Sequence, residues 1–376
     1  MKAKKKYSIC YIVTIPLTIR SFFIPQLNYL QEKGMNVTVI CQYDKNFRKE
    51  LKDINYIPVN IPRGINLFGM AGALFRLIKI FKKNQFDMIQ YSTPNAAFIS
   101  SLAGCIAGIK IRNYHMMGIR YLGFQGILKQ IFKFIEKITC MLSTSVECVS
   151  KTNLKLCIRE KLFRPEKGTV VWNGSTGGVD VTRFDISKRE EYRKRIREEL
   201  NISKDEFMFG FVGRITKDKG IEELVKAFLN LHRQAKLLIV GDIESDNNIS
   251  SEILETIKKN ENIIVHPFVN DIEKYYAAID CLVLPSYREG FGNVVIEAGA
   301  MGTGSIVSNI PGPKEIVKKI GGSICRVKDT ESLTKCMDEC MYRNFEKISD
   351  NVKKYYNQNE LNKHIYLRKQ QLLMKV

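Results

Sequence analysis

Two cations within a glycine-bounded turn are the first residues in this 376-residue chain whose pattern suggests chemistry. The segment from Gly213 to Gly220, GRITKDKG, follows an apolar strand-like run and opens a helix-like one. A helix N-terminus offers free backbone N–H groups and the positive end of the helix dipole, and both suit a phosphate group. Because Arg214 and Lys219 add two positive charges, the segment is suited to bind a diphosphate and to stabilise a departing one. The alternative for this motif alone is a solvated basic turn.

A second motif, SYREGFGNVVIE, holds two glutamates that lie eight residues apart. We place Glu289 in the loop after an apolar strand and Glu297 about one turn into the next helix, directed toward the same cleft. Carboxylates in this arrangement can accept hydrogen bonds from the hydroxyls of two linked sugar-like rings. Gly290 and Gly292 allow backbone N–H groups to approach a ligand closely. The alternative is a helix-capping acid with a buried, hydrogen-bonded glutamate, but the order of the two motifs in one domain favours a binding site.

These motifs and their surroundings carry a resemblance to a known family. GRITKDKG, LLIVGD, FVNDIEKYYAAIDCLVLPSYREGFGNVVIEAGAMG and IPGPKEIV resemble the donor domain of family-four retaining glycosyltransferases with the GT-B fold, whose hallmark is two Glu separated by seven residues. STGGVDVTRF resembles the segment that joins the family's two domains, so the likeness extends over nearly the whole chain. PSYREGFGNVVIEA is similar to bacterial polysaccharide enzymes that extend lipid-linked glycans, including diacetylbacillosaminyl-diphospho-undecaprenol GalNAc transferases.

The resemblance implies a role for each matching residue. Arg214 and Lys219 would bind the donor diphosphate, and Glu297 would bind the ribose hydroxyls. Glu289 would hold the donor sugar near its O3 and O4, and His115, although a lone histidine is more often structural, would lie near the sugar O6. His115, Arg214, Lys219 and Glu289 are therefore the expected catalytic residues. The full set expected at the donor is Gly213, Arg214, Lys219, Val269, Glu289, Gly290, Phe291, Gly292, Asn293 and Glu297, with the segment from His266 to Val269 bordering the nucleobase.

The same resemblance implies a mechanism and a set of partners. A nucleotide-diphosphate sugar, expected to be a UDP-sugar with an N-acetylhexosamine or hexose, would bind the C-terminal domain. The acceptor, expected to be a polyprenyl-diphosphate-linked glycan, would bind the N-terminal domain. Same-face attack would retain the anomeric configuration, and the departing diphosphate would take the acceptor proton. Because Arg214, Lys219 and the helix end would supply the positive charge, neither a metal ion nor a cofactor is expected.

Three positions depart from the family pattern. The loop after the first strand, residues 14–20, contains no glycine, which leaves its contact with the donor open. Met117 stands where an arginine usually follows the histidine, and residues 303–305 read Thr-Gly-Ser where Leu-Pro-Val is common. The two principal motifs are intact, so we expect an active enzyme.

The elements that must position these residues alternate along the chain. In the first half, strands are predicted over 7–15, 36–41, 87–91, 109–114 and 145–149, and helices over 22–33, 69–83, 95–108 and 125–141. After a glycine-rich break at 172–186, helices are predicted over 188–199, 220–234, 250–260, 271–278, 293–301 and 313–319, and strands over 207–212, 236–240, 262–266, 280–284, 304–308 and 323–327. Such alternation predicts an α/β protein with two doubly wound, Rossmann-like domains, which is the GT-B architecture.

We expect an acceptor-binding, membrane-facing domain over 1–185, a donor domain over 186–345, and a helical tail over 346–376 that packs back across both. The formal net charge is +20, and residues 1–185 contribute 28 basic and 11 acidic residues to it. The basic amphipathic helices at 69–83 and 125–141 can lie on an anionic leaflet. We therefore expect a cytoplasmic protein held peripherally on the inner face of the cell membrane. The alternative is that both are ordinary helices covering a sheet.

Other classes of protein fit the sequence less well. A hydrophobic content of 45% excludes a disordered or fibrous chain, and the ten cysteines lack the spacing of a zinc site, so free thiols such as Cys10, Cys41 and Cys281 are expected. A Rossmann dehydrogenase would need GxGxxG where this chain has TIPLTIR, and no nucleic-acid module is recognisable. The remaining alternatives are transfer to a soluble acceptor, another GT-B enzyme such as a phosphorylase, and a non-catalytic basic membrane- or nucleic-acid-binding module.

Overall fold

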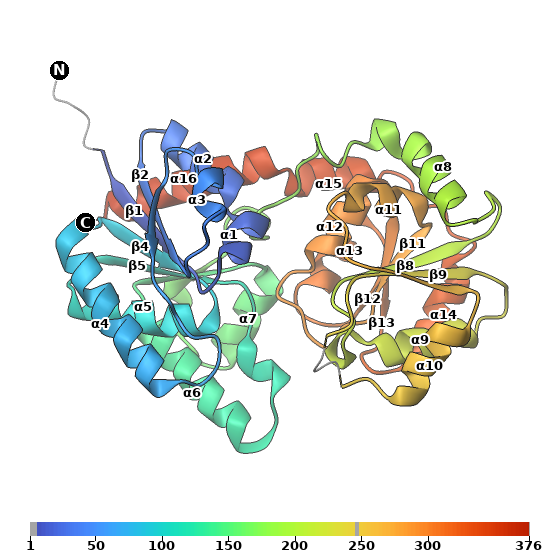
Figure 1. Ribbon diagram of the computed structural model, residues 1–376, viewed down its shortest axis with the longest axis horizontal. Helices are drawn as coiled ribbons and strands as arrows, with labels where there is room; N and C mark the ends of the chain where they lie inside the picture. Colours follow the sequence, from blue (N-terminus) through green and yellow to red (C-terminus); the bar gives the residue numbers. More distant parts are fainter. Residues whose placement is uncertain (1–5, 245–247, 376) are drawn as a thin grey trace. The chain divides into compact units, whose positions relative to one another are not determined.

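Apolar runs that are buried on both faces form two separate parallel sheets. The computed structural model describes residues 6–244 and 248–375, and the chain divides into two compact units. Unit 1 contains the residues up to Gly177 and those from Asn359 onward, and unit 2 runs from Gly178 to Gln358 (Figure 1). The chain therefore enters unit 2 at Gly178, eight residues before the expected position 186, and it returns to unit 1 at Asn359, within the tail expected over 346–376.

Unit 1 is built on a seven-stranded parallel sheet with the order β3-β2-β1-β4-β5-β6-β7. Its strands are β1 (Ser8–Ile12), β2 (Asn36–Cys41), β3 (Asn55–Pro58), β4 (Met88–Tyr91), β5 (Ile111–Met116), β6 (Ser145–Cys148) and β7 (Gly168–Thr169). Its helices are α1 (Pro16–Phe22), α2 (Ile24–Glu32), α3 (Phe47–Glu50), α4 (Leu67–Asn84), α5 (Pro94–Ile106), α6 (Gly126–Leu142), α7 (Lys151–Arg159) and α16 (Gln358–Leu373).

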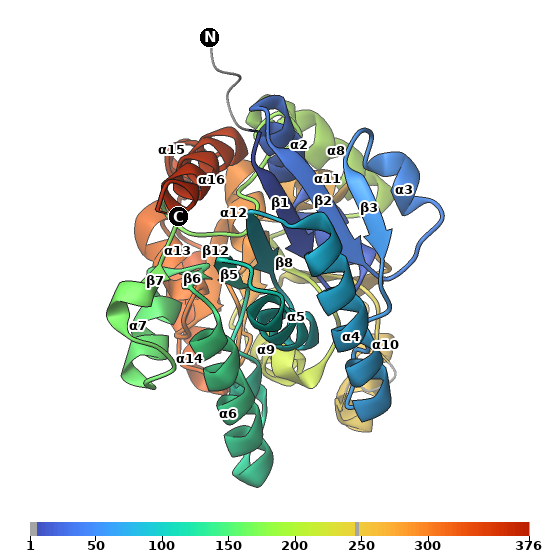
Figure 2. The ribbon, with the colours of Figure 1, turned by 90° about the vertical axis from the view of Figure 1, so that its left-hand side faces the viewer.

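The helices of unit 1 cover both faces of this sheet (Figure 2). On one face, α4, α5, α6 and α7 bury residues such as Leu77, Ala97 and Phe132 against the strands. On the other, α1, α2, α3 and α16 contribute Ile19, Leu27, Phe47 and Leu373 to a second core.

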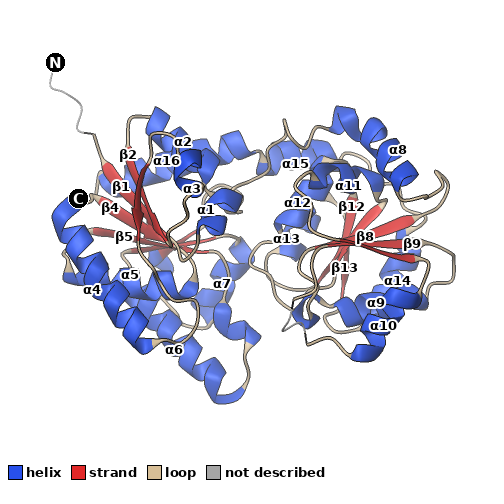
Figure 3. Cartoon of the chain, in the orientation of Figure 1, coloured by secondary structure: helices blue, strands red, loops and turns tan. Residues whose placement is uncertain are grey.

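Unit 2 repeats this plan, with helices packed around a central parallel sheet (Figure 3). The sheet has six strands in the order β10-β9-β8-β11-β12-β13. Its strands are β8 (Met208–Val212), β9 (Lys236–Val240), β10 (Ile263–His266), β11 (Cys281–Leu284), β12 (Gly304–Ser308) and β13 (Ser323–Cys325). Its helices are α8 (Arg189–Glu199), α9 (Ile221–Leu229), α10 (Ser251–Lys259), α11 (Ile272–Ala278), α12 (Asn293–Ala300), α13 (Pro313–Ile320), α14 (Thr330–Cys340) and α15 (Ile348–Tyr356). The expectation of two doubly wound, Rossmann-like domains is confirmed.

The expected elements agree best where a strand is wholly apolar, and they differ where the chain is more polar. The strands at 36–41, 236–240 and 304–308 have the expected bounds. The predicted helix at 22–33 is helix α2, which begins at Ile24, and the predicted loop at 14–20 is largely helix α1, because Pro16 suits a first helical position. Helix α7 was not among the expected elements; it buries Asn153 and Cys157.

All ten cysteines are free, and Cys10, Cys41 and Cys281 are buried as expected. Within the described residues, no helix is both long enough and apolar enough to cross a bilayer.

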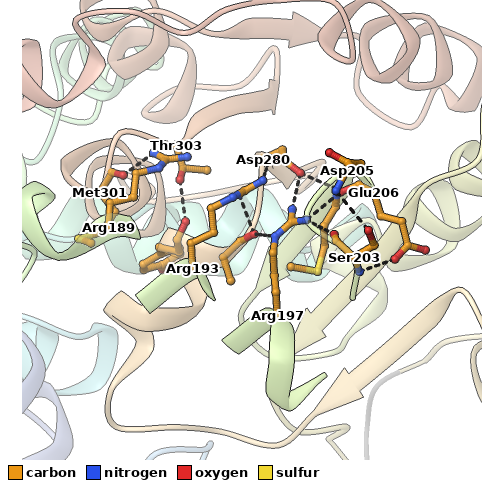
Figure 4. A network of polar contacts seen from close by, with 12 residues as sticks. Arg189, Arg193, Arg197, Ser203, Asp205, Glu206, Asp280, Met301 and Thr303 are labelled. Carbon is orange, nitrogen blue, oxygen red and sulfur yellow. Dashed lines mark hydrogen bonds and ion pairs between the residues drawn. The ribbon is translucent and has the colours of Figure 1, made fainter. Parts of the chain in front are cut away.

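A buried ionic network fastens the highly charged helix α8 to the sheet of unit 2 (Figure 4). Arg193 and Arg197 each donate to one carboxylate oxygen of Asp280, at 2.6 and 2.7 Å. Asp280 also accepts from the backbone N–H of Met208 at 2.7 Å, and Arg197 donates to the carbonyls of Ser203 and Glu206. One carboxylate thus balances two guanidinium groups at the base of β11.

Asp280→Ala should lower the free energy of unfolding by about 3 kcal/mol, because it leaves Arg197 buried without its counter-charge. Urea denaturation measures this change. Glu199→Ala is the matched control, since its ion pair with Arg195 is exposed and should contribute less than about 1 kcal/mol. Equal effects of the two substitutions would contradict the assignment.

Candidate active site

The motifs of unit 2 meet at the carboxyl edge of its sheet, where glycines allow backbones to touch. A Cβ on Gly241, after β9, would lie 1.9 Å from the carbonyl oxygen of Gly213, after β8. A Cβ on Gly220 would lie 2.3 Å from the carbonyl oxygen of Pro285, after β11. Only glycine fits either position, and Gly220 also adopts a φ of +75°. These contacts fix the segment 213–220 against its two neighbouring loops.

Asp218 joins the two motifs. Its backbone carbonyl accepts from the N–H of Tyr287 at 2.9 Å, and its carboxylate pairs with Arg288 at 3.0 Å. The hydroxyl of Thr216 donates to the same carboxylate at 2.7 Å. Burial opposes ionisation of Asp218, but the Thr216 hydrogen bond and the charges of Arg288 and Lys219 together lower its pKa. Asp218 is therefore a carboxylate that holds the two loops together.

Lys219 and Glu289, one from each motif, form a direct ion pair. The Lys219 ammonium lies 2.6 Å from Glu289 Oε1, and the hydroxyl of Ser286 donates to the same oxygen at 3.0 Å. Both charged side chains are mostly buried. Arg214 is more exposed, and its guanidinium pairs with Glu244 at 2.7 Å. Each expected diphosphate-binding cation thus has a carboxylate partner in this structure.

Glu297 lies one turn into α12, as expected, and its Oε2 accepts a hydrogen bond of 2.9 Å from the hydroxyl of Tyr276. Burial raises its pKa, against the opposing effects of Tyr276 and Arg183. Tyr276 is fully buried on α11, so it fixes the glutamate from the core side. The remaining carboxylate oxygen is the one suited to accept from ligand hydroxyls.

The loop between Glu289 and α12 is held by its own packing. Gly292 precedes the helix with a φ of +96°, and Phe291 is buried with its ring against Tyr356 at 5.6 Å. A Cβ on Gly312 would lie 2.8 Å from the carbonyl oxygen of Gly290, so the chain after β12 also touches this loop. The backbone of 290–293 is positioned from both sides.

The segment expected at the nucleobase follows β10. The His266 ring pairs with the hydroxyl of Tyr275 at 3.0 Å, and the backbone N–H of Phe268 donates to Asp242 at 3.3 Å. Val269 is partly exposed and lies two residues after Pro267. This segment therefore lies beside the loop after β9, which places Val269 at the same carboxyl edge.

His115 belongs to unit 1, at the carboxyl end of β5, and it is buried. Its Nε2 lies 3.4 Å from the hydroxyl of Thr176, and its Nδ1 lies 3.7 Å from Glu147 Oε2. The ten residues expected at the donor all fall in unit 2, whereas His115 is positioned by the sheet of unit 1.

Several residues that shape the site were not singled out from the sequence: Thr216, Asp218, Tyr276, Ser286, Tyr287 and Arg288. Five of them lie within the two motifs and Tyr276 lies about one turn before the buried strand β11, and these positions were the available signal. The position of Thr303 also acquires a role, since its hydroxyl donates to the carbonyl of Tyr276 at 2.6 Å. Within the described ranges, no group of three or more His, Cys, Asp or Glu side chains is arranged to hold a metal ion.

Comparison with known proteins identifies the chain. The family described as "Glycosyl transferases group 1" matches residues 192–361, and "Glycosyltransferase Family 4" matches residues 26–176. The chain is a glycosyltransferase with the GT-B fold. The expected family and enzyme class are thus confirmed, and the two matched regions contain the motifs of unit 2 and His115 of unit 1, respectively.

Relatives of this glycosyltransferase align along most of its length. It is 29% identical to the capsular polysaccharide biosynthesis glycosyltransferase CapM of Staphylococcus aureus, over 83% of this chain and 82% of the relative. It is 24% identical to an Escherichia coli enzyme named UDP-Gal:alpha-D-GlcNAc-diphosphoundecaprenol alpha-1,3-galactosyltransferase, over 87% and 86%.

Solved structures agree in fold. A glycosyltransferase from Rickettsia africae superposes with a TM-score of 0.78 at 22% identity, covering 98% of this chain and 99% of that one. Anabaena HepE, solved in complex with UDP and glucose, superposes with a TM-score of 0.77 at 18% identity, covering 97% and 100%.

Gly241→Ala should destabilise this glycosyltransferase by more than about 2 kcal/mol, because the new methyl group would overlap the Gly213 carbonyl. Gly72→Ala is the matched control. Gly72 lies within α4 with open space around it, so alanine should raise the free energy of unfolding by about 0.5–1 kcal/mol. Thermal unfolding of both variants measures the difference. A Gly241→Ala variant as stable as the parent would contradict the close approach.

Proposed function

We propose that this glycosyltransferase moves a hexose or N-acetylhexosamine from a nucleotide-diphosphate sugar to a lipid-linked glycan, with retention, in the synthesis of a bacterial surface polysaccharide. The observation that carries the proposal is the cluster of Arg214, Lys219 and Glu289 at the junction of two loops. The names of the relatives support it: CapM acts in capsule synthesis, and the Escherichia coli enzyme uses UDP-Gal and a diphosphoundecaprenol-linked acceptor. The HepE complex with UDP supports a uridine donor.

The paired charges suggest how a donor enters. A diphosphate carries more negative charge than a single carboxylate, so it competes with Glu244 for Arg214 and with Glu289 for Lys219. Once released from Lys219, Glu289 is free to accept hydrogen bonds from the sugar hydroxyls. The same two cations then stabilise the charge that grows on the diphosphate as it departs. Glu297, fixed by Tyr276, accepts from the ribose hydroxyls.

Retention follows in this proposal from attack on the face that the diphosphate leaves. The departing diphosphate takes the proton of the acceptor hydroxyl, the new glycosidic bond forms, and the bond to the diphosphate breaks. Arg214 and Lys219 supply the positive charge at the leaving group, so the reaction is proposed to proceed without a metal ion.

The basic helices of unit 1 are proposed to bind an anionic membrane that carries the acceptor. Helices α4 and α6 flank α5 on one face of the sheet (Figure 2). The segment leading into α4 and the helix itself expose Ile65, Leu67, Phe68 and Phe75, with Phe68 at 93%. Helix α6 exposes Ile127, Leu128, Ile131, Phe134 and Met141.

Only some of the apolar side chains of these two helices are available to a membrane. Leu77, Phe81 and Phe132 are buried in the core of unit 1, while Phe75 and Ile131 remain exposed. Exposed aromatic and aliphatic side chains beside lysines suit a headgroup layer. We propose a peripheral location on the inner face of the cell membrane for this reason.

Arg214→Ala should lower kcat/KM for the nucleotide sugar at least a hundredfold, because it removes about 3 kcal/mol of transition-state stabilisation at the diphosphate. Donor consumption in the presence of acceptor, followed by nucleotide release, measures it. Arg195→Ala, on the exposed surface of α8, should leave the rate unchanged. A rate for Arg214→Ala within threefold of the parent would refute the assigned role.

Lys82→Gln with Lys83→Gln should weaken binding to anionic vesicles about thirtyfold, since each near-surface cation contributes about 1 kcal/mol. Flotation with phosphatidylglycerol vesicles at two salt concentrations measures the partition. Lys258→Gln with Lys259→Gln, on α10 of unit 2, carries the same change in charge and should have little effect. Equal loss in both pairs, or binding that is insensitive to salt, would exclude the proposed surface.

A further inference from the structure

A row of polar side chains crosses one face of the sheet in unit 1. Gln90 on β4, Asn113 on β5, and Ser145 and Glu147 on β6 are all buried. Asn113 donates to Gln90 at 2.9 Å and accepts from Ser145. Because side chains alternate along a strand, this row shares its face with Ile9, Met88 and Ile111 of the apolar core. Buried polar groups need partners, and one end of this row, Glu147, carries a charge.

Helix α16 supplies the counter-charge from the end of the chain. Its buried residues Leu361, Ile365, Lys369 and Leu373 recur every four positions, so Lys369 occupies a place in the stripe where an apolar residue would pack. Lys369 is 0% exposed. Its ammonium donates to Glu147 at 2.9 and 3.1 Å and also to Gln90. The helix lies beside α2, where Tyr366 contacts Tyr29 (Figure 1).

A buried ion pair of this kind is seldom needed for stability alone. Removing two charges from water costs several kcal/mol, and an apolar pair of similar volume is often at least as stable. Burial lowers the pKa of Lys369, against the opposing effect of Glu147. Burial also opposes ionisation of Glu147, but Lys369 and His115 hold its pKa well below the usual range. Glu147 is therefore ionised beside Lys369, and its carboxylate also faces a third residue.

That third residue is His115. Glu147 Oε2, the oxygen closer to Lys369, is also the one that lies 3.7 Å from His115 Nδ1. On the other side of the ring, Nε2 lies 3.4 Å from the hydroxyl of Thr176, and Phe23 packs edge-on at 5.6 Å. A carboxylate beside Nδ1 favours the tautomer with a proton on Nδ1, which leaves Nε2 with its lone pair.

We propose that Lys369 is a positioning residue, which holds Glu147 as an oriented carboxylate and through it fixes the tautomer and protonation of His115. The C-terminal helix thereby becomes part of the support of the acceptor-side site. This inference deepens the proposed function, because the importance of the histidine for transfer rests on that function. The arrangement of Lys369, Glu147 and His115 itself does not depend on it.

The charged and titratable groups around the imidazole come from three elements, β1, β6 and α16. Tyr11 of β1 has its hydroxyl bonded to Gln26 at 2.7 Å, and its pKa is raised by burial and by Glu147. Arg368 of α16 lies 3.9 Å from Glu147 Oε1. Lys369 and Glu147 complete the set. Among the described residues, Glu147 is the carboxylate that faces His115, and Lys369 is the cation in closest contact with Glu147.

The test is to replace Lys369 by methionine and to measure the tautomer and protonation of the His115 imidazole directly. In Lys369→Met, the negative charge of Glu147 is balanced chiefly by the imidazole, so His115 should keep its second proton to a pH at least one unit higher than in the parent. Long-range ¹H–¹⁵N spectra of the full chain report the tautomer and the titration, and loss of the signal in His115→Gln assigns it among the four histidines. Lys363→Met, exposed on the same helix, is the control and should change neither.

A second variant keeps the proposal testable if Lys369→Met fails to fold. Glu147→Gln combined with Lys369→Met removes both charges, so it should fold, and His115 should populate both neutral tautomers. A tautomer and titration like those of the parent, in either folded variant, would overturn the proposal. If the imidazole changes as expected and transfer from a UDP-sugar falls about tenfold, the proposal and the role of His115 both hold. If the imidazole changes while transfer does not, the positioning stands and the role of His115 in the proposed function fails.

Discussion

The donor domain depends on the close approach of backbones at the carboxyl edge of its sheet. Parallel strands end at the same edge, so the loops after β8, β9 and β11 must share a small space. They can do so because Gly241 faces the carbonyl of Gly213, and Gly220 faces that of Pro285, without a Cβ between them. The resulting contact brings two motifs, separated by some seventy residues, into one cluster of charges.

The charges of that cluster are balanced within the protein. Residues 186–376 carry 31 basic and 28 acidic residues, so the donor half is nearly neutral, whereas the first 185 residues hold most of the excess. Arg214, Lys219 and Arg288 each pair with a carboxylate. Binding of an anionic ligand is then an exchange of partners rather than the filling of a positive pocket. The pairing also keeps the cations oriented, which lowers the cost of ordering them when a ligand binds.

Much of the fold and of the donor motifs could be predicted from the sequence, because both depend on residues that are close together in the chain. Apolar strands such as 236–240 and the spacing of Glu289 and Glu297 need only neighbouring residues to be recognised. The partners of these residues could not be predicted in the same way, because they come from distant parts of the chain. Lys369 meets Gln90 across 279 positions, and in the sequence it is one lysine among many in a charged tail.

The most direct measurement is a crystal structure of the full chain with UDP bound. The account predicts the diphosphate against Arg214 and Lys219, with Glu289 released from Lys219 and the ribose hydroxyls within hydrogen-bonding distance of Glu297. A nucleotide bound elsewhere, or one bound at this edge with the Lys219–Glu289 pair intact and no contact between Arg214 and the diphosphate, would contradict it.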